Sequence, residues 1–204
     1  MNGMTDKKQK KNADAKKAPD YLILVNRDHP FDKAFLDTIE LISFSNIADE
    51  ETLIEKKTNE AVLKLIDRMK EEGLTFGRGG VFRTVEYQQS IMDRFIQNKG
   101  LAYARRYVAE PGASEHHTGL AIDLIPFIDG AWRRKHEELF AATEQFAALH
   151  RILPEYGFIL RYPEGKEDIT KVSYEPWHIR YVGEEIAREI TDKGLTLEEY
   201  LEKN

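Results

Sequence analysis

The stretch S-E-H-H-T-G-L-A-I-D, residues 114–123, places two adjacent histidines before an apolar run that ends in an aspartate. A carboxylate at the end of a buried strand needs a partner charge or a metal ion, because burying an unpaired charge is costly. Far along the chain, the stretch S-Y-E-P-W-H-I-R-Y places His178 three residues after Glu175. One histidine of the pair, Asp123 and His178 could together supply three metal ligands. That number is typical of a catalytic zinc site, which keeps its fourth position open for water.

Each fragment taken alone has an ordinary structural explanation. His116 with Asp123 could be a hydrogen-bonded pair that holds a loop, and Glu175 with His178 could be a surface ion pair. Only the combination of the fragments is specific. The other histidines carry less information: we interpret two on a predicted helix as surface residues and one before a proline as structural, namely His136, His150 and His29.

Composition restricts the chemistry and the class of protein. The chain has 204 residues and no cysteine, so a metal site must use histidine and carboxylate ligands. With 41% hydrophobic residues, the chain can bury one good core, which favours a single domain. Residues 1–18 carry a net charge of +4 and leave the remainder at −10, from a total of −6. An acidic body argues against a nucleic-acid partner.

The first residues differ from the rest of the chain in having almost nothing apolar to bury. We therefore interpret residues 1–19 as a basic, disordered tail and residues 20–204 as the folded domain. No apolar segment of the length of a signal peptide or a membrane span follows the tail. As written, the sequence predicts a soluble, cytoplasmic monomer without a membrane span. The alternative is a cell-surface protein whose N-terminal anchor is missing.

Apolar spacing indicates an alternating α+β pattern. Residues 59–72 carry a helical apolar stripe that stops at Gly73, and a capping box of Thr196 and Glu199 predicts a C-terminal helix. The other predicted segments are helices at 86–97 and 137–152, and strands at 21–25, 120–125, 156–162 and 172–182.

Three runs resemble the VanY-type D-Ala-D-Ala carboxypeptidases, including their L,D-carboxypeptidase relatives and the soluble VanXY dipeptidase/carboxypeptidases. The runs are residues 100–123, the stretch Y-G-F-I-L-R-Y-P at 156–163 and the stretch Y-E-P-W-H-I-R-Y-V-G at 174–183. They contain the motifs S-x-H-x-x-G-x-A-x-D and E-x-W-H, which are specific in combination. With V-F-R-T-V-E-Y-Q at 81–88, the similarity covers roughly residues 20–204. It implies a single α+β domain with a small antiparallel sheet and helices packed around it.

The resemblance also implies a role for each motif residue. Zinc would be held by His116, Asp123 and His178. Glu175 would be the general base, which takes a proton from the water that zinc activates and delivers it to the leaving amine. Arg83 would hold the terminal carboxylate of the substrate or the developing oxyanion. Two more residues would help to bind the substrate, Ser114 and Gln88.

The E-P-W-H motif cannot use the helical spacing of an H-E-x-x-H site, because Pro176 favours an extended Glu175. In a regular strand, Glu175 and His178 would point to opposite faces. We therefore expect either a bend at Pro176 or a metal position beyond the end of the strand.

The chain departs from the family pattern at three places. The family's G-Y-R-S is V-F-R-T at 81–84, its S-E-H-Q is S-E-H-H at 114–117, and its I-T-G has Lys171 in place of glycine. Of the two adjacent histidines, His116 holds the motif's ligand position, so we expect it to bind the metal rather than His117. The changes beside Arg83 and at Lys171 could reshape the pocket and alter the substrate preference.

The sequence thus predicts a zinc-dependent carboxypeptidase that removes the C-terminal D-Ala from peptidoglycan stem peptides or their precursors. Both D,D- and L,D-specificity remain open at this point. One alternative is a catalytically inactive cell-wall peptide-binding module on the same fold, against which the intact Glu175 argues. A purely structural zinc domain is another, although closed structural sites normally have four ligands.

Overall fold

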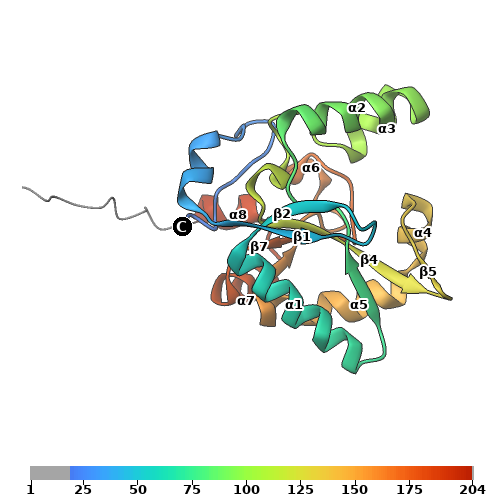
Figure 1. Ribbon diagram of the computed structural model, residues 1–204. Helices are drawn as coiled ribbons and strands as arrows, with labels where there is room; N and C mark the ends of the chain where they lie inside the picture. The colour runs from blue at the N-terminus through green and yellow to red at the C-terminus, as the bar shows by residue number, and fades with distance from the viewer. Residues whose placement is uncertain (1–18, 204) are drawn as a thin grey trace, which may run out of the picture.

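The computed structural model describes residues 19–203, so the predicted tail lies almost entirely outside the described residues (Figure 1). The α-helices are α1 (Lys56–Glu71), α2 (Val85–Lys99), α3 (Leu101–Tyr107), α4 (His136–Ala141), α5 (Thr143–Ile152), α6 (Glu167–Thr170), α7 (Glu184–Asp192) and α8 (Leu197–Lys203). Three 3-10 helices are η1 (Lys33–Thr38), η2 (Glu115–Thr118) and η3 (Leu153–Tyr156). The strands are β1 (Leu41–Ser45), β2 (Glu51–Glu55), β3 (Thr75–Arg78), β4 (Ala121–Ile128), β5 (Ala131–Trp132), β6 (Phe158–Leu160) and β7 (His178–Tyr181).

The main sheet is antiparallel, with strand order β3-β4-β7-β6 and with β5 paired to the end of β4. Strands β1 and β2 form a separate hairpin. The structure therefore confirms the predicted α+β class with a small antiparallel sheet. The longest strand of the sheet, β4, lies between β3 and β7. Asp123 of β4 is paired with His178 of β7.

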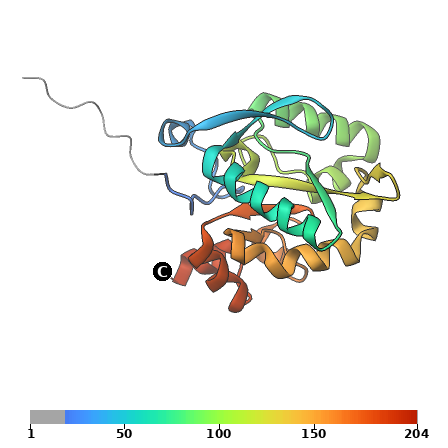
Figure 2. The ribbon, with the colours of Figure 1, turned by 60° about the horizontal axis from the view of Figure 1, so that its bottom comes forward.

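Helices cover both sides of the strands (Figure 1). Helices α2 and α3 lie on one side, whereas α1, α5 and α7 lie on the other, and Figure 2 shows the same separation after rotation. No helix in residues 19–203 combines the length and the apolar composition that crossing a membrane requires. The two groups of helices leave β4 and β7 between them, where the motif residues converge.

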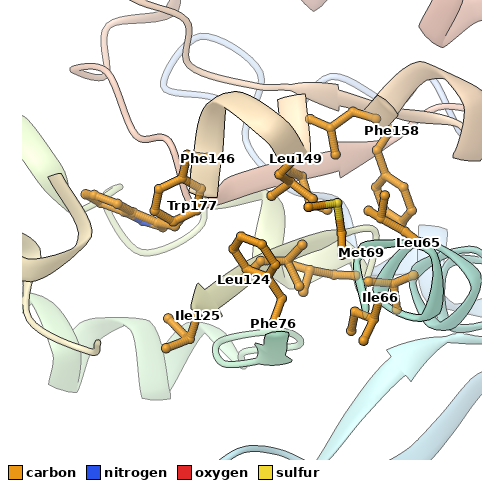
Figure 3. Close-up of a cluster of buried hydrophobic side chains, with 14 of the residues drawn as sticks. Leu65, Ile66, Met69, Phe76, Leu124, Ile125, Phe146, Leu149, Phe158 and Trp177 are labelled. Atoms are coloured by element: carbon orange, nitrogen blue, oxygen red, sulfur yellow. The ribbon is translucent and has the colours of Figure 1, made fainter. Parts of the chain in front are cut away.

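The main core packs the apolar stripe of α1 against the sheet and α5. Figure 3 shows Leu65 and Met69 of α1 facing Phe76 of β3, Leu124 of β4 and Leu149 of α5. These side chains are 0–3% exposed, so each contributes about 1.5–3 kcal/mol through burial. This packing holds β4 rigidly, and with β4 the backbone of Asp123.

Several predicted elements are confirmed, including the helices at α1 and α2, the buried strand β4 and the capping box of α8. In that box, the N–H of Thr196 donates to Glu199 Oε2 at 2.8 Å, and the N–H of Glu199 donates to Thr196 Oγ1 at 3.2 Å. Both bonds satisfy backbone donors that the first turn of a helix leaves free.

One predicted element is wrong, and two others differ in extent from the prediction. Residues 21–25 form no strand, because the carbonyl groups of Tyr21 and Ile23 accept from the Arg180 side chain instead of a neighbouring strand. The predicted helix at 137–152 is divided at Ala142, where ψ is 45°. The division allows Phe140 to pack on Trp177 while α5 faces the core. The predicted strand at 172–182 begins only at His178.

Candidate active site

The three predicted ligands come from three elements that meet at the centre of the molecule. Asp123 lies on β4 and is paired directly opposite His178, the first residue of β7. Residues directly opposite one another in an antiparallel pair present their side chains on the same face of the sheet. His116 lies on η2, immediately before β4, and its ring stands edge-to-face with that of His178, with centroids 4.8 Å apart. Strand register and a short 3-10 turn thus bring the ligand set together.

The carboxylate of Asp123 lies between the two histidine rings. Its Oδ1 is 3.4 Å from His116 Nε2 and 3.3 Å from His178 Nδ1, and it has no hydrogen-bond partner. Two ligand atoms that are each 2.0–2.1 Å from a tetrahedral ion lie about 3.3 Å apart. The unpaired oxygen and these two distances fit a zinc ion bound by one atom of each residue.

The ring of His116 is oriented by the backbone. Its Nδ1 lies 2.7 Å from the carbonyl oxygen of Val81, to which it can donate, and this leaves Nε2 directed at Asp123. Burial, together with the charge of Arg83, lowers the pKa of His116 to about 4. The ring is therefore neutral at physiological pH, which is the form that binds metal ions.

The neighbouring His117 has both ring nitrogens engaged elsewhere. Its Nδ1 lies 2.7 Å from the carbonyl oxygen of Arg83, and its Nε2 accepts from the N–H of Gly112 at 3.1 Å. The ring packs on Phe31. This arrangement supports His116, and not His117, as the ligand.

Glu175 lies in a turn just before β7. The N–H of His178 donates to the carbonyl of Glu175 at 3.2 Å, and Glu175 Oε2 comes within 3.8 Å of His178 Nδ1. The chain therefore bends at Pro176, and the bend brings Glu175 and His178 to the same place. Burial raises the pKa of Glu175 to about 8. A carboxyl group with such a pKa can both accept and release a proton near neutral pH.

Arg83 contacts the carboxylate oxygen of the candidate ligand Asp123 that faces away from the histidines. Its Nη2 donates to Asp123 Oδ2 at 2.6 Å, so one carboxylate oxygen is paired with Arg83 while the other faces the histidines. Gln88 accepts from Arg83 Nη1 at 3.4 Å and donates to the carbonyl of Ala109 at 2.8 Å. Ser114 caps η2 by accepting from the N–H of His116 at 3.4 Å.

These residues line a cleft of about 610 Å³. Its lining includes Gln88 and Phe95 of α2 and Thr52 and Leu53 of β2. The three candidate metal ligands line this cavity together with Glu175, Arg83 and Ser114. The cleft is large enough for a peptide, and Glu175 lies beside the three candidate metal ligands within it.

The chain is similar to known proteins over the region that contains these residues. The family model described as VanY: D-alanyl-D-alanine carboxypeptidase matches residues 51–184. The chain belongs to the VanY family. The matched range contains Arg83, Glu175 and the three candidate metal ligands.

Relatives extend the similarity over most of the chain. A D-alanyl-D-alanine carboxypeptidase of Enterococcus faecalis is 37% identical over 189 residues, which are 88% of this chain and 65% of that protein. A crystal structure of the vancomycin-resistance D,D-pentapeptidase VanY in complex with Zn(II) is 37% identical, with a TM-score of 0.75, and the match covers 89% of this chain and 98% of that one. The LD-carboxypeptidase LdcB is 36% identical, with a TM-score of 0.74, over 90% of this chain and 86% of that one. The chain spans between about half and two thirds of the length of the curated relatives that it matches.

Two departures from the VanY motifs, Val81 and Lys171, lie where the backbone conformation matters. Val81 is buried and supplies the carbonyl group that orients His116. Lys171 has φ +61°, the left-handed conformation that glycine adopts without strain. This VanY-family chain therefore keeps the glycine-like turn at Lys171 despite the side chain.

Two histidines that we interpreted as surface residues are partly buried in the VanY fold. His136 lines the cleft and packs on Trp177, with ring centroids 4.9 Å apart, and Tyr103 Oη lies 3.0 Å from its Nδ1. His150 Nε2 lies 2.9 Å from the carbonyl oxygen of Pro176 and so contacts the turn that carries Glu175. Their polar sequence neighbours concealed this packing, because α4 and α5 each bury one face. His29 is exposed in its turn.

Three charged residues that we did not predict from the sequence lie beneath the VanY site. Glu115, Arg161 and Arg180 are each at most 1% exposed and are joined by hydrogen bonds. A signal was present, because both arginines lie inside the apolar runs F-I-L-R-Y and W-H-I-R-Y, where a charge needs a buried partner.

Proposed function

We propose that this VanY-family protein is a zinc-dependent carboxypeptidase that removes the C-terminal D-Ala from peptidoglycan stem peptides or their precursors. One observation carries the proposal: the unpaired Asp123 Oδ1 lies at zinc-ligand spacing from His116 and His178, with Glu175 beside them in a peptide-sized cleft. The names of the relatives, a D-alanyl-D-alanine carboxypeptidase and a zinc-bound D,D-pentapeptidase, support the same chemistry.

Each residue would have a distinct task in the hydrolysis. His116, Asp123 and His178 would hold the zinc ion. When bound, zinc lowers the pKa of a water molecule from 15.7 to about 7 and polarises the scissile carbonyl group. Glu175 would accept the proton of the attacking water and then donate it to the leaving amine of D-Ala. Buried beside this position, its carboxyl group has little competing bulk water.

Arg83 would recognise the end of the substrate. Its side chain is 17% exposed and lines the cleft, so guanidinium N–H groups not used by Asp123 are available to a carboxylate. Gln88 and Ser114, which flank Arg83 and His116, would complete the pocket for the C-terminal residue.

The decisive test is to offer three substrates to the zinc-loaded protein and to identify the products by mass. These are free D-Ala-D-Ala, a pentapeptide that ends in D-Ala-D-Ala, and a tetrapeptide that ends in a single D-Ala after an L-centre. We expect release of D-Ala from at least one peptide. Cleavage of the pentapeptide alone would assign D,D-specificity, and cleavage of the tetrapeptide alone would assign L,D-specificity. Release of D-Ala from none of the three would refute the proposal.

A second experiment tests the role of Arg83. A hydrogen bond to a charged group contributes about 1.5–3 kcal/mol, so Arg83→Ala should lower kcat/KM by about tenfold to a few hundredfold. Amidating the substrate's C-terminus should impair cleavage by the wild type but matter far less to the variant, because the partner charge is already absent. The kinetics should be measured at saturating zinc, since Arg83 also pairs with Asp123.

Arg94→Ala is the matched control for this experiment. Arg94 lies on α2 at the same cleft, and its removal takes away an equal charge without affecting Asp123. It should retain the full penalty for amidation. If amidation costs the wild type and Arg83→Ala equally, Arg83 does not read the chain end.

A further inference from the structure

A cluster of four charged side chains lies beneath the candidate metal site. It comprises Glu115 of η2, Arg161 after β6, Arg180 of β7 and Glu198 of α8, which are 0–8% exposed. Burying two ion pairs removes four charges from water, and apolar residues of similar volume often serve stability as well or better. The position of this cluster, rather than its contribution to stability, therefore requires an explanation.

The two arginines fix the carboxylate of Glu115 in one orientation. Its Oε1 accepts from Arg161 Nε and from Arg180 Nη1, both at 2.7 Å. Arg161 is held in turn by Glu198, through bonds of 2.8 Å and 2.6 Å from its Nη1 and Nη2. The arginines leave the other oxygen of Glu115 free, and its direction is set by their contacts with Oε1.

That free oxygen faces the candidate ligand His178. In the described part of the chain, three buried side-chain polar atoms lack a hydrogen-bond partner: Glu115 Oε2, His178 Nε2 and Asp123 Oδ1. Glu115 Oε2 and His178 Nε2 lie 3.7 Å apart, while His178 Nδ1 lies 3.3 Å from Asp123 Oδ1. The two nitrogens of the ring thus face two different carboxylates, one in the charge cluster and one at the metal position.

We propose that Glu115 is a positioning residue for the metal site, which accepts the Nε2 proton of His178 and so keeps the Nδ1 lone pair directed at the zinc ion. A carboxylate behind a metal-binding histidine fixes the tautomer and the orientation of the ring and makes it a better ligand. Arg161 and Arg180 support this role by holding Glu115 in place. The inference rests on the zinc site of the proposed function but not on the identity of the peptide substrate.

Strand geometry explains how the sequence builds this arrangement. His178 and Arg180 are two residues apart on β7, so their side chains lie on the same face. The residue paired opposite Arg180 is Ala121, whose small side chain leaves room for a guanidinium group on that face. Glu115 immediately precedes His116, so one short turn supplies both a metal ligand and the residue that orients another ligand.

The experiment compares Glu115→Gln with Glu198→Gln. Each variant removes one carboxylate charge that is hydrogen-bonded to Arg161, but only Glu115 faces His178. Zinc affinity is measured by competition with a chelator, and the stability of the metal-free proteins by thermal unfolding. We expect Glu115→Gln to weaken zinc binding by about 10- to 100-fold, the range typical of such outer-shell partners. Glu198→Gln should bind zinc like the wild type, although both variants should be less stable.

A zinc affinity that falls equally in both variants, or that is unchanged in Glu115→Gln, would show that the cluster is merely structural. Histidine-ring NMR of the zinc-loaded wild type provides a measurement that needs no variant. It should find the proton of the His178 ring on Nε2, and a proton on Nδ1 would overturn the proposal. A wild type that binds no zinc would refute both this inference and the proposed function, whereas a zinc-binding protein that cleaves no D-Ala peptide would refute the proposed function alone.

Discussion

Glu175→Gln is expected to retain zinc and to bind stem peptides, but to lose turnover by about 10²- to 10⁴-fold, the contribution typical of a general acid–base group. The amide has nearly the shape of the carboxyl group, yet it cannot take a proton from water or pass one to the leaving amine. Single-turnover kinetics and zinc content, measured on the same preparation, separate the loss of chemistry from the loss of metal.

Glu164→Gln is a suitable control for the Glu175 variant. Glu164 is exposed on the neighbouring loop, so this change makes the same substitution away from the cleft and should leave the rate unchanged. Unchanged turnover in Glu175→Gln would mean that the proton is carried by another group. If the wild type binds stem peptide and zinc but releases no D-Ala, the chain is a binding module on this fold.

The second large effect concerns the adjacent histidines. His116→Ala should lower zinc affinity by more than the 10- to 100-fold typical of an outer-shell residue, because it removes one of three direct ligands. His117→Ala should retain most of the zinc, since both nitrogens of His117 are bonded to the backbone. The metal content of the purified proteins after dialysis against a weak chelator provides the measurement.

The two histidine substitutions control for one another, because each removes one buried imidazole from the same turn. His117→Ala should be destabilised by the loss of its two hydrogen bonds, while its zinc affinity stays close to that of the wild type. Loss of zinc from His117→Ala, with retention in His116→Ala, would exchange the assignments of the two rings.

The sequence indicated the candidate site residues because each motif that contains them is short and local. His116 and Asp123 are separated by a turn and the start of a strand, and Pro176 indicated that Glu175 could not share a regular strand with His178. Of the two expected geometries, the structure has the bend at Pro176, before β7 begins. Local patterns also predicted α1, whose apolar stripe follows the helical period.

Other features depend on contacts that no local pattern contains. The hairpin of β1 and β2 was missed because its strands are only partly buried and lack a continuous apolar run. The pairing of Glu115 with Arg161 and Arg180 joins residues that are 46 and 65 positions apart. Spacing alone cannot predict such partners, and the same holds for the contact of His150 with the Pro176 carbonyl.

The pairing of Asp123 with His178 links the proposed metal site to the folding of the whole domain. Their strands are joined by a long stretch of chain, so the ligand atoms come together only after a costly loop has closed. An unfolded chain would therefore present no comparable site, and the free energy of zinc binding would add to the stability of the fold. Free zinc at 100 times its Kd would add about 2.7 kcal/mol. The supply of metal would then govern how much of the chain stays folded and escapes proteolysis, as well as how fast it works.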